Sequence, residues 1–226
     1  MNLIMGRSKL DKFKDNEQSD YVIQPGKEIF GKIKGKWKRQ YFRNNNPVVL
    51  ELACGRGEYT IGLARLFPER NFIGVDIKGP RIWRGGKTAE EEGLKNAGFL
   101  RCQVQNLRDF FEKGEVNDIW ITFPDPRPKG KDERRRLTHP RFIEIYRHIM
   151  RPDGWVFLKT DNDGLYQYSL EILSGLRDVY DLTFTPDLYN SSLLSDHYGI
   201  QTTYEKRYLD NGIKMKYLKF RFSYRL

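Results

Sequence analysis

The chain has very little of the residue types that build metal sites and disulfide frameworks. Its 226 residues include two cysteines, Cys54 and Cys102, and three histidines, His139, His148 and His197. Two cysteines cannot form a disulfide framework, and the scattered histidines form no cluster at metal-ligand spacing. The sequence therefore predicts neither a structural nor a catalytic metal.

Long apolar runs are also missing. No window reaches the roughly 20 residues that a membrane-spanning helix needs, and the amino terminus has no apolar core of signal-peptide length before its charges begin. Neither a Gly-x-Ser-x-Gly elbow nor a Gly-x-x-x-x-Gly-Lys phosphate loop occurs, which disfavours the hydrolase and NTPase classes. We therefore expect a cytoplasmic protein that makes no use of a membrane.

Positive charge is what the chain has in excess. Its 40 lysines and arginines outnumber 30 acids, for a formal net charge of +10. Such an excess indicates an anionic partner, with nucleic acid the leading candidate. A hydrophobic fraction of 38% at this length is enough for one well-buried domain.

The order of patterns along the chain predicts a doubly wound α/β fold. Residues 1–46 lack sustained periodicity and form a basic amino-terminal extension, whose first 25 residues we expect to be mobile without RNA; residues 47–226 form the main domain. In the main domain, β-rich runs alternate with helical spacing, which indicates a mainly parallel sheet with helices on both faces. The expected strands are 48–53, 72–77, 99–104, 118–123, 155–159, 180–185 and 215–224, and the expected helices are 59–67, 81–96, 107–113, 140–150 and 165–173.

The loop after the first strand favours a nucleotide-like cofactor. Gly55 and Gly57 can adopt positive φ and let the backbone approach a ligand, and Asp76 ends the next strand where an acid can accept hydrogen bonds from ribose hydroxyls. Dinucleotide enzymes share these features. Glu51, however, would repel a pyrophosphate and attract the cationic amino-acid end of S-adenosylmethionine, and the third glycine of the dinucleotide fingerprint is missing. These residues favour S-adenosylmethionine over NAD.

A carboxylate between two prolines follows the fourth strand. In the run Phe-Pro-Asp-Pro-Arg-Pro-Lys at residues 123–129, each proline fixes its own φ and pushes the residue before it toward extended geometry. Asp125 should therefore be held rigidly at the carboxyl end of a buried strand, where parallel sheets bind ligands. A stiffened structural loop without a ligand is the alternative.

The ordered set of motifs resembles the bacterial tRNA (guanine-N7)-methyltransferases. Its members are Glu51-Leu-x-x-Gly-x-Gly, Gly74-Val-Asp-Ile, Phe123-Pro-Asp-Pro with Lys129, the arginine run at 134–136, Lys159-Thr-Asp and Thr202-Thr-Tyr-Glu. The resemblance extends from about residue 48 to the carboxyl end. It implies a class I methyltransferase sheet of seven strands with the last antiparallel. It also implies transfer of a methyl group from S-adenosylmethionine to a guanine in the variable loop of tRNA.

The resemblance also implies a site. Cofactor contacts map to Glu51, Asp76, Asn106 and Asp125, and substrate contacts map to Lys129, Asp161, Thr202, Thr203, Tyr204 and Glu205. The family usually has an acid at the position of Asn106. Because guanine N7 carries an exposed lone pair, methylation needs alignment and electrostatic support more than a strong base. We assign that support to Asp125, and hydrogen bonds from guanine N1 and its amine to Asp161 and Glu205. Alternatively, Asp161 caps the following helix and residues 202–205 form an ordinary turn.

Two basic stretches suggest a path for RNA phosphates. Residues 27–43 hold seven lysines and arginines against one acid, interleaved with Phe30, Trp37, Tyr41 and Phe42, and residues 127–141 hold seven against two acids. Such side chains supply affinity by neutralising phosphates. In the second stretch we expect RNA contacts from Lys131, Arg134, Arg135 and Arg136.

Two other functions stay open at this level. A class I methyltransferase acting on a small molecule or a protein would share the cofactor residues but would not need the basic stretches. An RNA-binding protein that has lost catalysis would keep the charge and tolerate the change at Asn106. The sequence does not separate a monomer from a homodimer.

Overall fold

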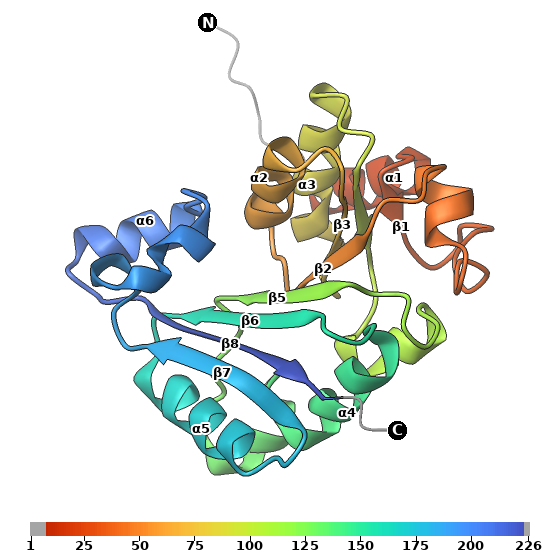
Figure 1. Ribbon diagram of the computed structural model, residues 1–226. Helices are drawn as coiled ribbons and strands as arrows, with labels where there is room; N and C mark the ends of the chain where they lie inside the picture. The colour runs from red at the N-terminus through yellow and green to blue at the C-terminus, as the bar shows by residue number, and fades with distance from the viewer. Residues whose placement is uncertain (1–7, 224–226) are drawn as a thin grey trace, which may run out of the picture.

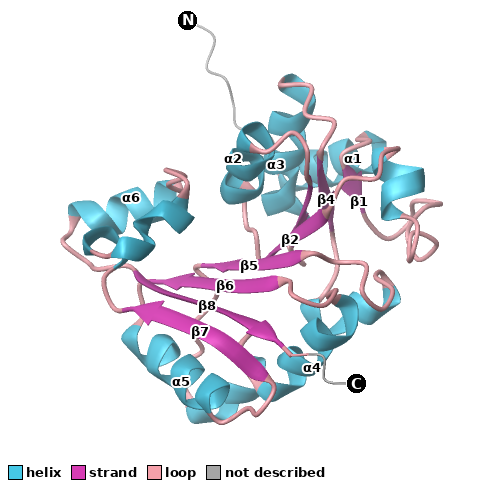
Figure 2. Ribbon diagram, viewed as in Figure 1, coloured by secondary structure: helices cyan, strands magenta, loops and turns pink. Residues whose placement is uncertain are grey.

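A computed structural model, which describes residues 8–223, shows a single twisted sheet covered by helices on both faces (Figures 1 and 2). Among these residues the sheet has eight strands in the order β1-β4-β3-β2-β5-β6-β8-β7. β8 runs antiparallel to both of its neighbours, and every other pairing is parallel. The doubly wound α/β fold with an antiparallel last strand is confirmed.

The strands and helices lie close to their expected positions. The strands are β1 Val22–Ile23, β2 Val48–Leu52, β3 Asn71–Val75, β4 Ala97–Leu100, β5 Asp118–Thr122, β6 Trp155–Thr160, β7 Val179–Thr185 and β8 Lys216–Phe222. The helices are α1 Lys9–Gln18, α2 Glu58–Leu66, α3 Gly79–Glu91, α4 Pro140–Ile149, α5 Asp163–Ser174 and α6 Thr203–Asp210. Residue 224 of the last expected strand lies outside the described residues.

Several elements differ from the expectation: β4 ends at Leu100 and not at residue 104, and α1 and α6 were not expected. α3 ends at Glu91 because Gly93 takes a φ of +65°, and the expected helix at 107–113 is a 3₁₀ turn, Val104–Asp109. The sheet has eight strands where the resemblance implied seven, since Val22 and Ile23 pair with β4 along its edge. A two-residue strand has too short a pattern to be found from the sequence.

The amino-terminal segment packs on the rest of the fold. α1 lies against α3, where the Trp83 indole donates to Asp15 (2.8 Å) and the Asn16 amide donates to the Gly79 carbonyl (2.9 Å). Residues 8–23 therefore have regular structure and specific contacts. The first seven residues of the stretch that we expect to be mobile lie outside the described part.

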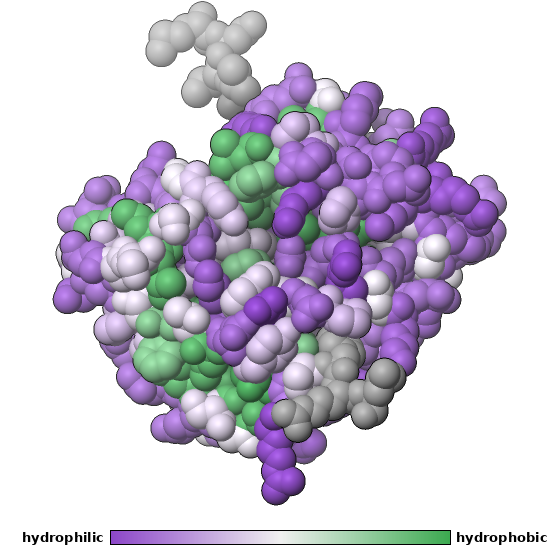
Figure 3. Space-filling view, in the orientation of Figure 1, coloured by the Kyte–Doolittle hydropathy of each residue, from purple (hydrophilic) through white to green (hydrophobic). Residues whose placement is uncertain are grey.

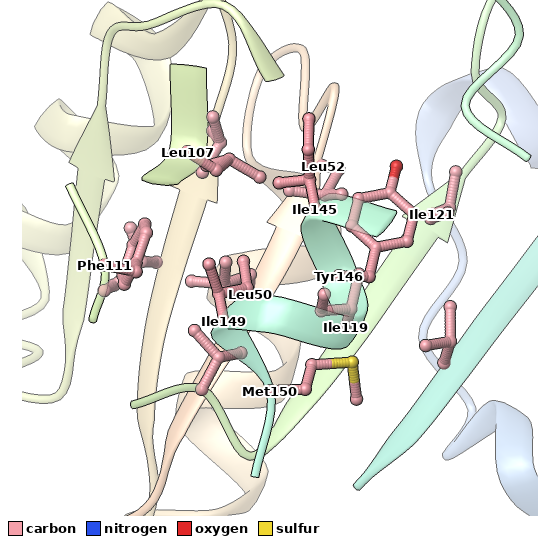
Figure 4. Packing of buried hydrophobic residues seen from close by; sticks show 14 of the residues in the cluster. Leu50, Leu52, Leu107, Phe111, Ile119, Ile121, Ile145, Tyr146, Ile149 and Met150 are labelled. Atoms are coloured by element: carbon pink, nitrogen blue, oxygen red, sulfur yellow. The ribbon is translucent and has the colours of Figure 1, made fainter. Parts of the chain in front are cut away.

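A large apolar cluster fills the space between the sheet and α4. Figure 4 shows Ile145, Tyr146 and Ile149 of α4 directed at Leu50 of β2 and Ile119 of β5. All five side chains are buried, which makes burial of apolar surface the main source of stability here. α2 and α3 cover the opposite face of the sheet through a second cluster.

Exposed apolar surface occurs in several places on the face seen in Figure 3. Green patches lie over β7 and α5 at the lower left, over α2 and over the lobe of α6, with hydrophilic surface between them. Phe184 of β7 is 52% exposed and Leu66 of α2 is 50% exposed. None of the helices between residues 8 and 223 has the length and apolar content needed to span a bilayer.

Candidate functional site

A cleft of about 1230 Å³ opens at the carboxyl ends of β2 and β5, with α2 and α3 on one side and α6 on the other. Figure 1 shows α6 in a lobe beside α2. Ligands of parallel sheets bind at this end of the strands. The predicted residues that line the cleft are Glu51, Gly55, Thr202, Thr203 and Tyr204; Thr122 and Phe123 of the β5 end also line it.

The glycine loop between β2 and α2 is shaped by close packing. Gly57 has a φ of +73°, and a Cβ there would lie 2.4 Å from the ring of Phe99. Gly55, with a φ of +58°, has no neighbour within 4 Å of a Cβ position and lines the cleft. Gly57 is therefore needed for packing, whereas Gly55 leaves its backbone open to a ligand.

Glu51 lies at the base of the cleft with both carboxylate oxygens engaged. One oxygen accepts from the backbone N–H and hydroxyl of Thr60, and the other accepts from the hydroxyl of Thr122. A carboxylate has about four acceptor sites, which leaves room for one more donor. Burial raises the pKa of Glu51 to about 7, against the opposing hydrogen bonds and the positive charge of Lys159.

Asp76 directly follows β3 and is held in place by backbone groups. Its Oδ2 accepts from Gly55 N–H (3.1 Å) and its Oδ1 accepts from Lys78 N–H (2.8 Å). Its side chain thus joins the glycine loop to the start of α3. Cys54, next to this loop, is buried, and burial raises the pKa of its thiol, consistent with packing and not with a nucleophile.

A buried ion pair fastens α6 to the sheet. Lys159 Nζ lies 2.8 Å from Glu205 Oε2, and both side chains are 0% exposed. The ammonium lies over the rings of Tyr59 (4.7 Å) and Phe123 (5.3 Å). Burial lowers the pKa of Lys159, although the charge of Glu205 opposes that shift.

The second oxygen of Glu205 is also engaged. Oε1 accepts from the hydroxyl of Tyr189 (3.0 Å) and lies 3.3 Å from His197 Nε2. Burial alone would raise the pKa of Glu205, but His197 and Lys159 hold it below its usual value. The prediction that Glu205 receives the guanine edge is not supported by this arrangement, because protein groups occupy both of its oxygens.

The residues before Glu205 face the cleft. Thr202 caps α6 by accepting from Glu205 N–H (3.1 Å), and Thr203 bonds across the cleft to Glu58 of α2 through its backbone and its hydroxyl (2.7 Å each). Tyr204 is 42% exposed, lies beside Phe123 (5.3 Å between ring centroids) and donates to Asp161 (3.2 Å). Thus residues 202–205 form the start of a helix and not an ordinary turn, and Asn162, not Asp161, caps α5.

The Pro-Asp-Pro loop leaves β5 through an unusual conformation. Phe123 has a φ of +47° and Arg127 a φ of +48°, both in the left-handed region. Asp125 has a 60% exposed side chain, accepts from Arg127 N–H (3.2 Å) and pairs with the guanidinium of Arg127 at 3.3 Å. Local contacts therefore orient Asp125, although it is not part of the cleft lining.

The remaining predicted residues lie outside the cleft lining. Asn106 is exposed in the 3₁₀ turn after β4, and Lys129, Lys131, Arg134 and Arg135 are exposed in the loop after β5. Arg136 differs from them, because its guanidinium donates to the Arg127 carbonyl (3.2 Å) and lies over the ring of Tyr168 at 4.3 Å. Arg136 therefore supports the Pro-Asp-Pro loop, and its guanidinium group is less available to RNA.

The basic stretch 27–43 does not flank the cleft as expected. Glu115, ahead of the amino end of β5, accepts from the backbone N–H groups of Gly35 (2.9 Å) and Trp37 (3.3 Å). Trp37 is fully buried, and Phe42 nearly so, in the apolar cluster on the α4 side. Trp37 and Phe42 are core residues, and Phe30 and Tyr41 are partly buried against the same core. The second half of the stretch lies at the opposite end of the strands from the cleft.

Three residues of the site carried no signal of their own in the sequence. Thr60 and Thr122 bind Glu51, and Glu58 binds Thr203. In the sequence, Thr60, Thr122 and Glu58 look like ordinary residues of a helix or a strand. In the described part of the chain, no three histidine, cysteine or acidic side chains lie close enough together to hold a metal ion.

Comparison with known proteins identifies the relatives of this chain. A family model described as "Putative methyltransferase" matches residues 45–218. The tRNA (guanine-N(7)-)-methyltransferase of Cytophaga hutchinsonii is 54% identical over 96% of this chain and 99% of its own length. That of Christiangramia forsetii is 44% identical, covering 95% and 98%.

Solved structures show the same fold at low identity. The 16S rRNA methyltransferase KamB superposes with a TM-score of 0.61 at 15% identity, over 88% of this chain and 95% of its own. A structure described as an antibiotic-related methyltransferase gives a TM-score of 0.58 at 18% identity, with 89% and 96% covered. At such identities the likeness concerns the fold alone.

Proposed function

Because the chain belongs to the tRNA (guanine-N(7)-)-methyltransferase family, we propose that it transfers a methyl group from S-adenosylmethionine to N7 of a guanine in tRNA. The observation that supports this most directly is the buried Glu51 at the base of the cleft, beside the open glycine loop and Asp76. The same residues were expected, from their chemistry alone, to hold a cationic amino-acid group and a ribose.

The residues present fit S-adenosylmethionine. Glu51 keeps one acceptor site for an ammonium group, Gly55 offers open backbone, and Asp76 presents a fixed carboxylate for ribose hydroxyls. This methyl donor supplies an electrophilic carbon on a sulfonium sulfur. The protein must then bring guanine N7 into line with that carbon, and alignment can contribute roughly 7 to 11 kcal/mol at best.

The guanine side of the site is formed by α6 and the ends of β5 and β6. Phe123 and Tyr204 present adjoining aromatic surfaces, on which a base removed from its stack can lie. Asp161, next to Tyr204, is placed to accept from N1 and the exocyclic amine of guanine. The carboxylate of Asp125 would stabilise the positive charge that develops on the purine ring as N7 is methylated.

The experiment that tests the proposal is direct. The protein is incubated with S-adenosylmethionine and unmodified tRNA, the tRNA is digested, and 7-methylguanosine is measured by mass spectrometry. We expect 7-methylguanosine only when protein and donor are both present. Donor binding without any methylated tRNA would favour another substrate, and absence of donor binding would favour an RNA-binding protein without catalysis.

Changing Asp76 should weaken donor binding and loosen the glycine loop or the start of α3, because an asparagine nitrogen cannot accept from one of the two backbone N–H groups that Asp76 binds. Asp76→Asn keeps the shape but loses the charge that strengthens a ribose hydrogen bond, worth about 1.5 to 3 kcal/mol, or roughly 10- to 150-fold in Kd. Calorimetric titration with S-adenosylmethionine would measure the change. An unchanged Kd would remove Asp76 from the proposed ribose site.

Donor binding should strengthen as pH rises through neutrality. The pKa of Glu51 is about 7, so the carboxyl is mostly protonated at pH 6 and mostly ionised at pH 8. A cationic group on the donor favours the ionised form, so affinity should rise by up to about tenfold from pH 6 until the donor's own ammonium group begins to lose its proton. Glu51→Gln should bind weakly and show no such rise. A flat profile in the unaltered protein would contradict contact between Glu51 and the donor's ammonium.

A further inference from the structure

Besides Arg65, which is paired with Glu92, five basic side chains from four segments line one cleft. They are Lys12 of α1, Arg56 of the glycine loop, Arg81 and Arg84 of α3, and Lys206 of α6, together called the cleft cations. None of them belongs to the two basic stretches found in the sequence. The fold brings them together at the mouth of the site, whereas it carries the second half of stretch 27–43 to the other end of the strands.

The cleft cations are accessible and not neutralised by close acids. Four of them are exposed, and the half-buried Lys12 lies over the ring of Trp83 at 5.0 Å. Within residues 8–223, no ion pair joins any of the five to a carboxylate.

The acids that line the same cleft are mostly engaged elsewhere. Glu58 binds Thr203, and Glu92 is bonded to Arg65. Glu51 is buried at the base of the cleft. Glu91 lies two turns beyond Arg84, at the far end of α3. The cleft lining therefore holds six basic side chains against four acids, one of which is buried at the base, and is net positive.

Arg56, Arg81 and Arg84 form one continuous surface. Arg81 and Arg84 are three residues apart and so lie on the same side of α3. A Cβ on Gly85 would lie only 3.0 Å from the Arg56 carbonyl, so α3 packs directly on the glycine loop at this point. All three arginines are exposed and line the cleft where the methyl donor is proposed to bind.

We propose that the cleft cations bind phosphates of the tRNA backbone on either side of the methylated nucleotide. The inference rests on the proposed function. Guanidinium groups recognise phosphates with paired hydrogen bonds, and a cleft concentrates their field on a polyanion. Contacts on both walls, from α3 and from Lys206, would hold the RNA so that the target base lies against Phe123 and Tyr204.

The test compares two double variants that remove the same charge. Arg81→Ala/Arg84→Ala removes two cleft cations, and Lys34→Ala/Arg39→Ala removes two exposed cations from stretch 27–43. Binding of unmodified tRNA is measured by fluorescence anisotropy at several salt concentrations. Thermal melting and the Kd for S-adenosylmethionine are measured for both variants.

We expect Arg81→Ala/Arg84→Ala to bind tRNA on the order of tenfold more weakly, and the slope of log affinity against log salt to become shallower by about two. Its melting temperature and donor affinity should match the unaltered protein, and Lys34→Ala/Arg39→Ala should bind tRNA normally. Equal losses in both variants, or an unchanged salt slope in the first, would overturn the inference. Neither result would affect the proposed function, which fails only if the unaltered protein forms no 7-methylguanosine.

Discussion

Replacing Lys159 with methionine should lower the free energy of unfolding by about 3 to 5 kcal/mol, the usual cost of leaving one member of a buried ion pair uncompensated. The loss follows from the 0% exposure of both Lys159 and Glu205, since no water can reach the orphaned carboxylate. His197 and Tyr189 still contact Glu205, which places the expected value toward the lower limit. Urea denaturation followed by fluorescence measures the change.

The matched control is the double variant Lys159→Met/Glu205→Gln. Removing both charges takes away the uncompensated carboxylate, so more than half of the lost stability should return. The double variant should nonetheless methylate tRNA poorly, because α6 would lose the contact that fixes Thr203 and Tyr204 over the cleft. A single variant that costs less than about 1 kcal/mol would mean that the ion pair is solvated in solution.

Replacing Asp125 with alanine should reduce kcat for methyl transfer by about 10²- to 10³-fold, the typical effect of removing one group that stabilises developing charge. Asp125 is oriented by Arg127 and lies between two prolines, yet its side chain is 60% exposed. The fold should therefore be unaffected, and single-turnover rates with saturating tRNA and donor would measure the loss.

Two further variants separate the possible roles of Asp125. Asp125→Asn keeps the shape and removes the charge, so an electrostatic role predicts a rate close to that of the alanine variant. Glu171→Ala removes an exposed acid of α5 that is not part of the cleft lining, and should leave the rate unchanged. Full activity in Asp125→Ala would exclude Asp125 from the reaction.

The fold was largely predictable because its signals are local. The strand at 48–52 and the helix at 58–66 follow from apolar runs, two glycines and a proline that are close together in the sequence. The helix beginning at Thr203 was not found. Its eight residues are mostly polar, and the helix depends on the burial of Glu205 against Lys159, 46 residues away.

The candidate site was predictable only in part. Glu51 and Asp76 were identified because acids at strand ends have a specific chemical meaning beside a glycine loop. The partners of Glu205 were not identified from the sequence. A carboxylate that could accept hydrogen bonds from guanine is chemically identical to one that neutralises a buried lysine. Only the burial of Glu205 and its distance from Lys159 distinguish the two roles.

The amino-acid sequence by itself predicted most of the strands and helices of the main domain, the acids at the strand ends beside the glycine loop and the family, since these depend on the identity and spacing of near neighbours. The tertiary structure alone decided which positive charges reach the cleft. Lys34 and Arg39 belong to a stretch whose aromatic residues enter the core at the opposite end of the strands from the cleft. Arg81 and Arg84 come from a helix that packs against the glycine loop. Electrostatic attraction depends on distance in space, which the folding of the chain sets and the sequence spacing does not.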